Sequence, residues 1–130
     1  MGDRGARHDE SGRGHHDAAG RHEEAAGRWD ERGEAELAEF ERRAAGLERE
    51  GALLEADRGE LERLRAGWLE HRGEGDRAEI EHRTVEIERR AAQLAADCAA
   101  LERERMTRLQ ERERAVAKGL SHQAVAGVAI

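Results

Sequence analysis

Large apolar residues recur every seven positions through the middle of the chain. One series is Phe40, Leu47, Leu54, Leu61 and Trp68, and a second is Ile80, Ile87, Leu94 and Leu101. An apolar residue at every seventh position is typical of the seam of a coiled coil, where helices pack side by side. The pattern therefore predicts an all-α fold with an extended coiled coil over residues 29–118.

The two series are out of phase, which indicates a break between two helices. Twelve residues separate Trp68 from Ile80, and this spacing is not a whole number of helical turns. His71 and Arg72 before a glycine are typical of a helix end, and Asp76 with Glu79 forms a capping box. We expect helices over about 30–72 and 76–118 with a break at 73–75. The residues that define this break are Gly73, Gly75 and Asp76.

Two arrangements of these helices are compatible with the pattern. In an antiparallel hairpin, which we favour, large residues meet small ones, with Leu54 beside Ala91 and Gly51 beside Leu94. Like charges argue against it, because glutamates flank the same edge of both helices. These glutamates are Glu41, Glu48, Glu55 and Glu62 in the first helix and Glu81, Glu88 and Glu102 in the second. The alternative is one nearly continuous long helix that oligomerises.

An internal repeat of 40 residues accompanies the seven-residue spacing. Residues 29–74 align with residues 69–114, and the large seam positions of the two segments coincide. Arg32-Gly33-Glu34 aligns with Arg72-Gly73-Glu74, and Leu61-Glu62-Arg63 aligns with Leu101-Glu102-Arg103. The alignment indicates a duplicated helical unit.

Both ends of the chain lack this apolar periodicity. Residues 1–28 consist mainly of glycine, histidine, arginine, acidic residues and alanine, so we expect a disordered tail. Residues 119–130 predict a flexible apolar tail. Imidazole binds zinc, nickel and copper, which makes the N-terminal histidines weak candidates for metal ligands. They are His8, His15, His16 and His22.

Composition and charge narrow the class of protein. The chain has 130 residues, 41% of them charged, with a net charge of −7 and no proline. A mildly acidic chain is a poor nucleic-acid binder by bulk charge, and no apolar stretch is long enough for a membrane. A single cysteine fits a reducing compartment, so we expect a cytoplasmic protein. The end of the second helix is locally basic, through Arg103, Arg105, Arg108, Arg112, Arg114 and Lys118.

The remaining candidate residues suggest no catalysis. Cys98 lies on the predicted seam, where we expect it to fill the core, and Trp29 is a candidate anchor for a partner. No phosphate-binding loop, metal-ligand spacing or nucleophile with a base is present. We therefore expect a non-catalytic structural or interaction module, without cofactor or small-molecule substrate, whose partner is itself or another helical protein. The alternative is a nucleic-acid-associated or weak metal-binding protein that uses the basic helix end or the histidines.

Overall fold

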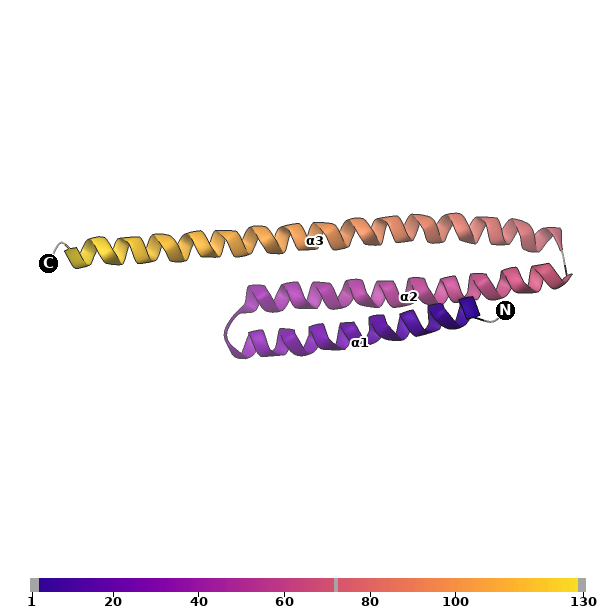
Figure 1. Cartoon of the computed structure of the whole chain (residues 1–130), viewed down its shortest axis with the longest axis horizontal. Helices are drawn as coiled ribbons and strands as arrows, with labels where there is room; N and C mark the ends of the chain where they lie inside the picture. The colour runs from indigo at the N-terminus through magenta and orange to yellow at the C-terminus, as the bar shows by residue number, and fades with distance from the viewer. Residues whose placement is uncertain (1–2, 72, 129–130) are drawn as a thin grey trace. The chain divides into compact units, whose positions relative to one another are not determined.

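The described part of the chain forms three helices (Figure 1). The computed structural model describes residues 3–71 and 73–128. Helix α1 spans Asp3–Glu31, α2 spans Ala35–His71 and α3 spans Glu74–Val128. These described residues contain no strand, so the predicted all-α class is confirmed.

The chain divides into two units. The first, residues 1–98, contains α1, α2 and the first part of α3. The second, residues 99–130, contains the continuation of α3. Its described side chains are mostly exposed, and Arg108 donates a hydrogen bond to Glu111 one turn later at 3.4 Å.

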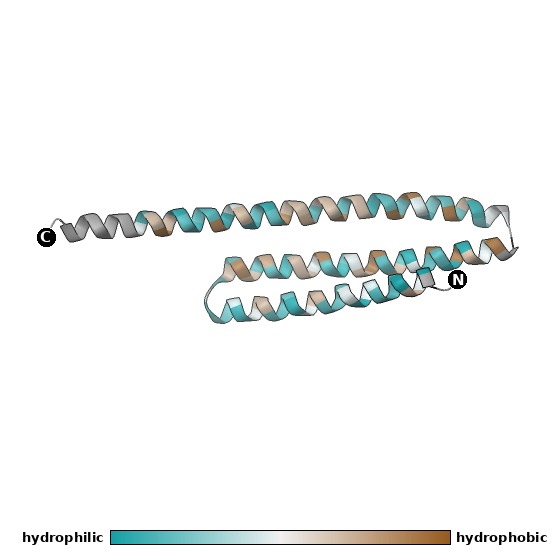
Figure 2. Cartoon of the chain, viewed as in Figure 1, coloured by the Kyte–Doolittle hydropathy of each residue, from teal (hydrophilic) through white to brown (hydrophobic). Residues whose placement is uncertain are grey.

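Helix α1 occupies the segment for which the sequence predicts a disordered tail. The segment has no large apolar residue before Trp29, and Figure 2 colours it mostly as hydrophilic or intermediate. It contains several glycines, each of which costs a helix roughly 0.5–1 kcal/mol relative to alanine. Its helix therefore depends on packing, and the packing comes from α2, which lies beside α1 in Figure 1.

A glycine turn ends α1 and directs the chain into α2. Gly33 has a φ of 73°, in the left-handed region that favours glycine. Its N–H donates to the carbonyl of Asp30 at 3.0 Å, and the N–H of Glu34 donates to the carbonyl of Trp29 at 2.9 Å. These two bonds form a Schellman motif, which satisfies the last carbonyls of α1. The carbonyl of Glu34 then accepts from Ala38 at 3.0 Å and begins α2.

A second break separates α2 from α3. Helix α2 ends at His71 and α3 begins at Glu74, so the non-helical Gly73 falls within the predicted break. Gly75 and Asp76, which are also expected to define the break, lie in the first turn of α3 instead. The carbonyl of Gly73 accepts hydrogen bonds from Arg77 N–H at 3.3 Å and from Trp68 Nε1 at 3.0 Å. Helix α3 continues past the expected end at residue 118 to Val128. Gly119 lowers helix propensity by about 1 kcal/mol, but without a proline nearby it does not stop the helix.

Candidate helix-pairing interfaces

Small residues at every seventh position bring α1 and α2 close together. On both helices these residues are buried, and Ala38 and Ala45 are completely inaccessible. A Cβ on Gly5 would lie 3.8 Å from the carbonyl oxygen of Gly59, and one on Gly12 would lie 3.7 Å from that of Ala52. We call this set the small-residue seam. It comprises Gly5, Gly12, Ala19 and Ala26 of α1 with Ala38, Ala45, Ala52 and Gly59 of α2.

Three histidines of α1 form a second series along one edge of this seam. The Nδ1 atoms of His8, His15 and His22 each lie 2.6 Å from a glutamate oxygen of α2. From one pair to the next, the residue number rises by seven in α1 and falls by seven in α2, as antiparallel helices require. We call these pairs the histidine ladder. They are His8–Glu55, His15–Glu48 and His22–Glu41.

The chemistry of the ladder fixes the donor in each pair. An ionised carboxylate can only accept hydrogen bonds, so each imidazole donates from Nδ1. The ladder is partly shielded from solvent, because the side chain of His8 is 29% exposed and that of Glu55 is 11% exposed. A net hydrogen bond of this kind contributes about 0.5–1.5 kcal/mol, or more when its partner is charged.

Gly51 makes room for the central histidine of the ladder. A Cβ at this position would lie 3.0 Å from Cε1 and Nδ1 of His15. The structure therefore corrects the prediction that Gly51 faces Leu94. The glutamates of α2 are placed differently as well, because Glu41, Glu48 and Glu55 bind the histidines of α1. The predicted like-charge edge is relieved by a helix that the sequence pattern did not predict.

Glu55 is the most buried charged residue of the ladder, with 8% of its surface exposed. Burial alone would raise its pKa. Hydrogen bonds from His8 and from Arg58, the latter at 2.8 Å, outweigh burial and lower the pKa below the usual glutamate value. Glu55 therefore stays ionised and links α1 to α2 at this position.

The other edge of the small-residue seam carries pairs of acidic and arginine side chains. Asp9 accepts a hydrogen bond from Arg63 at 2.5 Å. The same seven-residue steps connect Glu23 with Arg49 and Asp30 with Arg42. These side chains are about half exposed, so each pair contributes at most about 1 kcal/mol. The two edges differ in chemistry, so they favour one orientation of α1.

The face of α2 opposite the small-residue seam carries large apolar residues. Leu54 and Leu61 are buried in one cluster with Ile87 of α3. Polar contacts accompany it: Arg65 donates to the hydroxyl of Thr84 at 3.0 Å, and Arg90 pairs with Asp57. The partly buried residues against this cluster are Ile80, Ala91 and Leu94.

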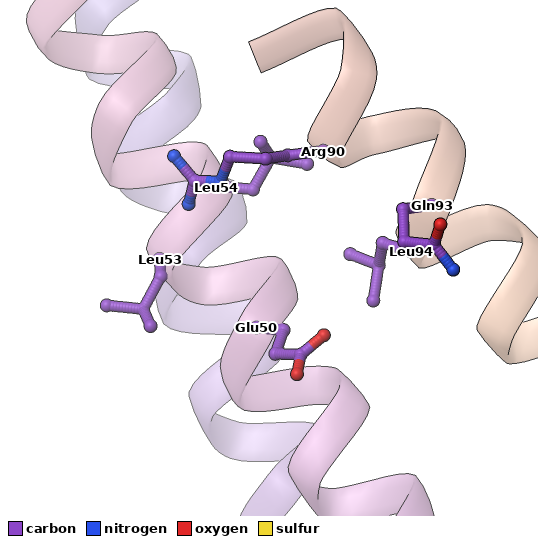
Figure 3. A pocket seen from close by; sticks show the side chains of 6 residues that line it. All are labelled: Glu50, Leu53, Leu54, Arg90, Gln93 and Leu94. Carbon is purple, nitrogen blue, oxygen red and sulfur yellow. The ribbon is translucent and has the colours of Figure 1, made fainter. Parts of the chain in front are cut away.

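A groove lies between α2 and α3 beside this cluster (Figure 3). Glu50, Leu53 and Leu54 line it from α2, and Arg90, Gln93 and Leu94 line it from α3. Leu53 is 62% exposed, so the groove carries apolar surface open to solvent. It shows no convergent set of polar groups of the kind that small-molecule sites use.

The other predicted seam residues lie in varied surroundings. Phe40 is 6% exposed, and Arg43 lies over its ring at 5.8 Å. Leu47 is half-buried, Trp68 is half-buried with its indole bonded to Gly73, and Leu101 belongs to the second unit.

Cys98 does not fill the core, because it is exposed. Partial burial raises the pKa of its thiol, and the nearby carboxylates of Glu48, Asp97 and Glu50 raise it further. The thiol is therefore kept protonated, which opposes nucleophilic reactivity. Trp29, the candidate partner anchor, is half-buried beside the first turn, with Arg32 over its ring at 5.4 Å.

The N-terminal histidines are separated by the helix, with His16 exposed and the other three in the histidine ladder. No group of three metal-binding side chains occurs in residues 3–71 and 73–128. Among the same residues, no helix has the length and apolar character needed to cross a bilayer.

Comparison of the chain with known protein families, with curated proteins and with solved structures finds no match.

Proposed function

We propose that the chain is a non-catalytic helical interaction module, built as an antiparallel coiled coil in which α2 pairs with a helix on each of two opposite faces. One observation carries the proposal: the seven-residue register shared by the histidine ladder, the small-residue seam and the acid–arginine edge. Because all three sets of contacts repeat at the same seven-residue spacing, we infer that this surface selects its partner helix by sequence.

Specific pairing needs both attraction to the right partner and penalties against wrong ones. The small-residue seam admits only a helix with small residues at every seventh position, because a larger side chain would separate the backbones. The histidine and acid–arginine edges penalise a parallel orientation, which would set the histidines against arginines and the acidic residues of α1 against glutamates. Such a surface suits a spacer, adaptor or oligomerisation element.

The hairpin of α2 with α3 is the second part of the proposal. The shared cluster of Leu54, Leu61 and Ile87, and the pair of Arg90 with Asp57, support it. The alternative of one continuous helix would leave Leu54 and Leu61 without this cover.

Charge exchange across the histidine ladder tests the proposed recognition. Replacing Glu41, Glu48 and Glu55 with lysine should release α1 from α2, because an ammonium group cannot accept the hydrogen bond that each imidazole donates. Replacing His8, His15 and His22 with glutamate in that variant should restore the pairing. Hydrogen exchange of α1 amides reports both steps, since a released helix exchanges much faster. If the first variant leaves α1 as protected as in the native chain, the ladder does not select the helix and the proposal fails.

A further inference from the structure

Helix α3 repeats the surface that α2 uses to hold α1. The 40-residue repeat aligns Ala38, Ala45 and Ala52 of α2 with Ala78, Val85 and Ala92 of α3. It also aligns the ladder residues Glu41 and Glu48 with Glu81 and Glu88. On the other edge it aligns Arg42 and Arg49 with His82 and Arg89. Seam, acidic edge and basic edge recur in the same register over residues 78–92, with valine in place of the central alanine. The acidic edge ends at Glu88, because Ala95 aligns with Glu55.

In α3 this surface is uncovered. Val85 is 58% exposed, and Ala78 and Ala92 are exposed. Glu81 is 69% exposed and lies 3.4 Å from Arg77 of its own helix, while Glu88 and Arg89 are exposed. The surface lies opposite Ile80 and Ile87, which contact or join the apolar cluster with α2. Helix α3 therefore packs its large residues against α2 and exposes its small residues to solvent. The small residues of α2 would be exposed in the same way if α1 were absent.

The two outer helices differ in what they present to solvent. The positions of α1 opposite its seam are Arg7, Gly14, Arg21 and Arg28, all exposed and mostly charged. Terminal units of repetitive helical proteins are closed by such a polar face. Helix α1 has this polar closing face, whereas α3 carries an alanine and valine seam in the equivalent place.

We propose that this face of α3, residues 78–92, is a docking site for a helix supplied by another polypeptide with the chemistry of α1. This inference rests on the proposed function. The partner carries glycine or alanine at every seventh position, with imidazole or a basic side chain three residues later and a carboxylate four residues later. We place the partner on α3 as α1 lies on α2, with the α2 positions moved by the 40 residues of the repeat. The basic or imidazole side chains of the partner then meet Glu81 and Glu88, and its carboxylate meets Arg89.

Charge complementarity excludes the simplest self-pairing. In the α1–α2 register, the position three residues after the seam meets the same position of the other helix. Two copies of α3 paired this way would place Glu81 and Glu88 against glutamates, and His82 and Arg89 against cations. Both edges would repel, whereas an α1-type helix is complementary on both.

A labelled peptide of residues 3–31, added to the full chain, tests the docking site. The chain's own α1 covers α2, so a peptide added in trans reports the face of α3. Fluorescence anisotropy should show saturable binding, weakened at least about tenfold by Glu81→Lys with Glu88→Lys. A peptide with His15→Glu and His22→Glu should bind this variant and recover the lost affinity.

The matched control is Glu104→Lys with Glu111→Lys, which makes the same charge change at the same seven-residue spacing outside residues 78–92 of α3. It should leave peptide binding unchanged. Absence of binding, or equal loss in both variants, would overturn the inference. Because α1 of the full chain stays protected from hydrogen exchange in either case, that result would leave the proposed function intact.

Two further outcomes also decide against a separate partner helix. If the peptide binds while α1 loses its protection from exchange, it has displaced α1 from α2 and the site is not on α3. If light scattering shows a dimer that the Glu81→Lys, Glu88→Lys variant dissociates, the occupant is a second copy of the chain.

Discussion

The two faces of α2 hold their neighbours by different physical means. Toward α1, the contact consists of glycine and alanine, with polar pairs along both edges. Toward α3, it consists of buried leucine and isoleucine. Burial of a leucine stabilises a fold by about 1.5–3 kcal/mol, several times more than burial of an alanine methyl group. Each buried leucine therefore stabilises its contact more than each alanine does, whereas the alanine face relies on many small contacts and on polar pairs, which in the proposed function give it selectivity.

This difference implies that the two contacts fail differently. The leucine face tolerates exchange of one aliphatic residue for another of similar volume, because apolar attraction has no direction. The alanine face depends on close approach of backbones, so added volume is more damaging there than lost volume.

Leu61→Ala should cause the largest loss of stability. Leu61 is 4% exposed in the cluster with Ile87, and removal of a buried leucine side chain costs about 2–5 kcal/mol. Urea denaturation followed by circular dichroism measures the loss. Leu53→Ala is the matched control, since Leu53 is 62% exposed and should change stability by less than about 0.5 kcal/mol. Equal losses of stability in the two variants would contradict the burial of Leu61 between α2 and α3.

Ala45→Leu should destabilise the pairing of α1 with α2 by about 1–3 kcal/mol, because Ala45 has no accessible surface and the seam has no space for a larger side chain. Ala66→Leu is the control: Ala66 continues the same seven-residue series but is exposed. Hydrogen exchange of α1 amides should rise in the first variant alone. An α1 that stays protected beside Leu at position 45 would show that the seam is not closely packed.

Two glycines of α2 should respond to alanine with opposite sign. A Cβ at Gly46 meets nothing within 4 Å, so Gly46→Ala should stabilise the helix by about 0.5–1 kcal/mol. At Gly51 the same Cβ displaces the ring of His15 and weakens its bond to Glu48, so Gly51→Ala should destabilise the chain or gain nothing. Thermal melting of the two variants gives the comparison. Equal stabilisation would place His15 away from Gly51.

The smallest predicted effect depends on pH and concerns Glu55. Its folded-state pKa is lowered, so its contribution is complete above the ordinary glutamate pKa and is lost as the pH falls through the folded-state value. Glu55→Gln should therefore cost on the order of 1 kcal/mol at pH 7 and progressively less below about pH 4. Urea denaturation at several pH values checks this. A difference between native chain and variant that is independent of pH would contradict the assigned role of the carboxylate.

Sequence periodicity predicted the large-residue face of α2 and α3 but not α1. The seven-residue series of leucine and isoleucine is strong because those side chains are apolar and large. The equivalent series in α1 consists of Gly5, Gly12, Ala19 and Ala26, which contribute little apolar surface and resemble a disordered composition. The signals that could have identified α1 were the seven-residue spacing of His8, His15 and His22 and the spacing of these small residues.

The 40-residue repeat also predicts the turn between α1 and α2. Arg32-Gly33-Glu34 aligns with Arg72-Gly73-Glu74, and both glycines lie between helices. A break predicted at one copy therefore applied to the other. The position of α2 between two neighbours could not be predicted from its own apolar series, because a helix that packs on opposite faces has no single apolar side.

The most direct test of the account is a pair of distances between spin labels in single chains that carry Cys98→Ala. Labels at positions 13 and 53 report α1 against α2, and labels at 53 and 93 report α2 against α3. Both pairs are 40 residues apart, and Arg13, Leu53 and Gln93 are exposed. Adjacent antiparallel helices predict about 20–30 Å for each pair, from an interaxial distance of about 10 Å plus the label arms. A distance of about 60 Å in either pair, the length of 40 residues of straight helix, would contradict the pairing of α2 on that face.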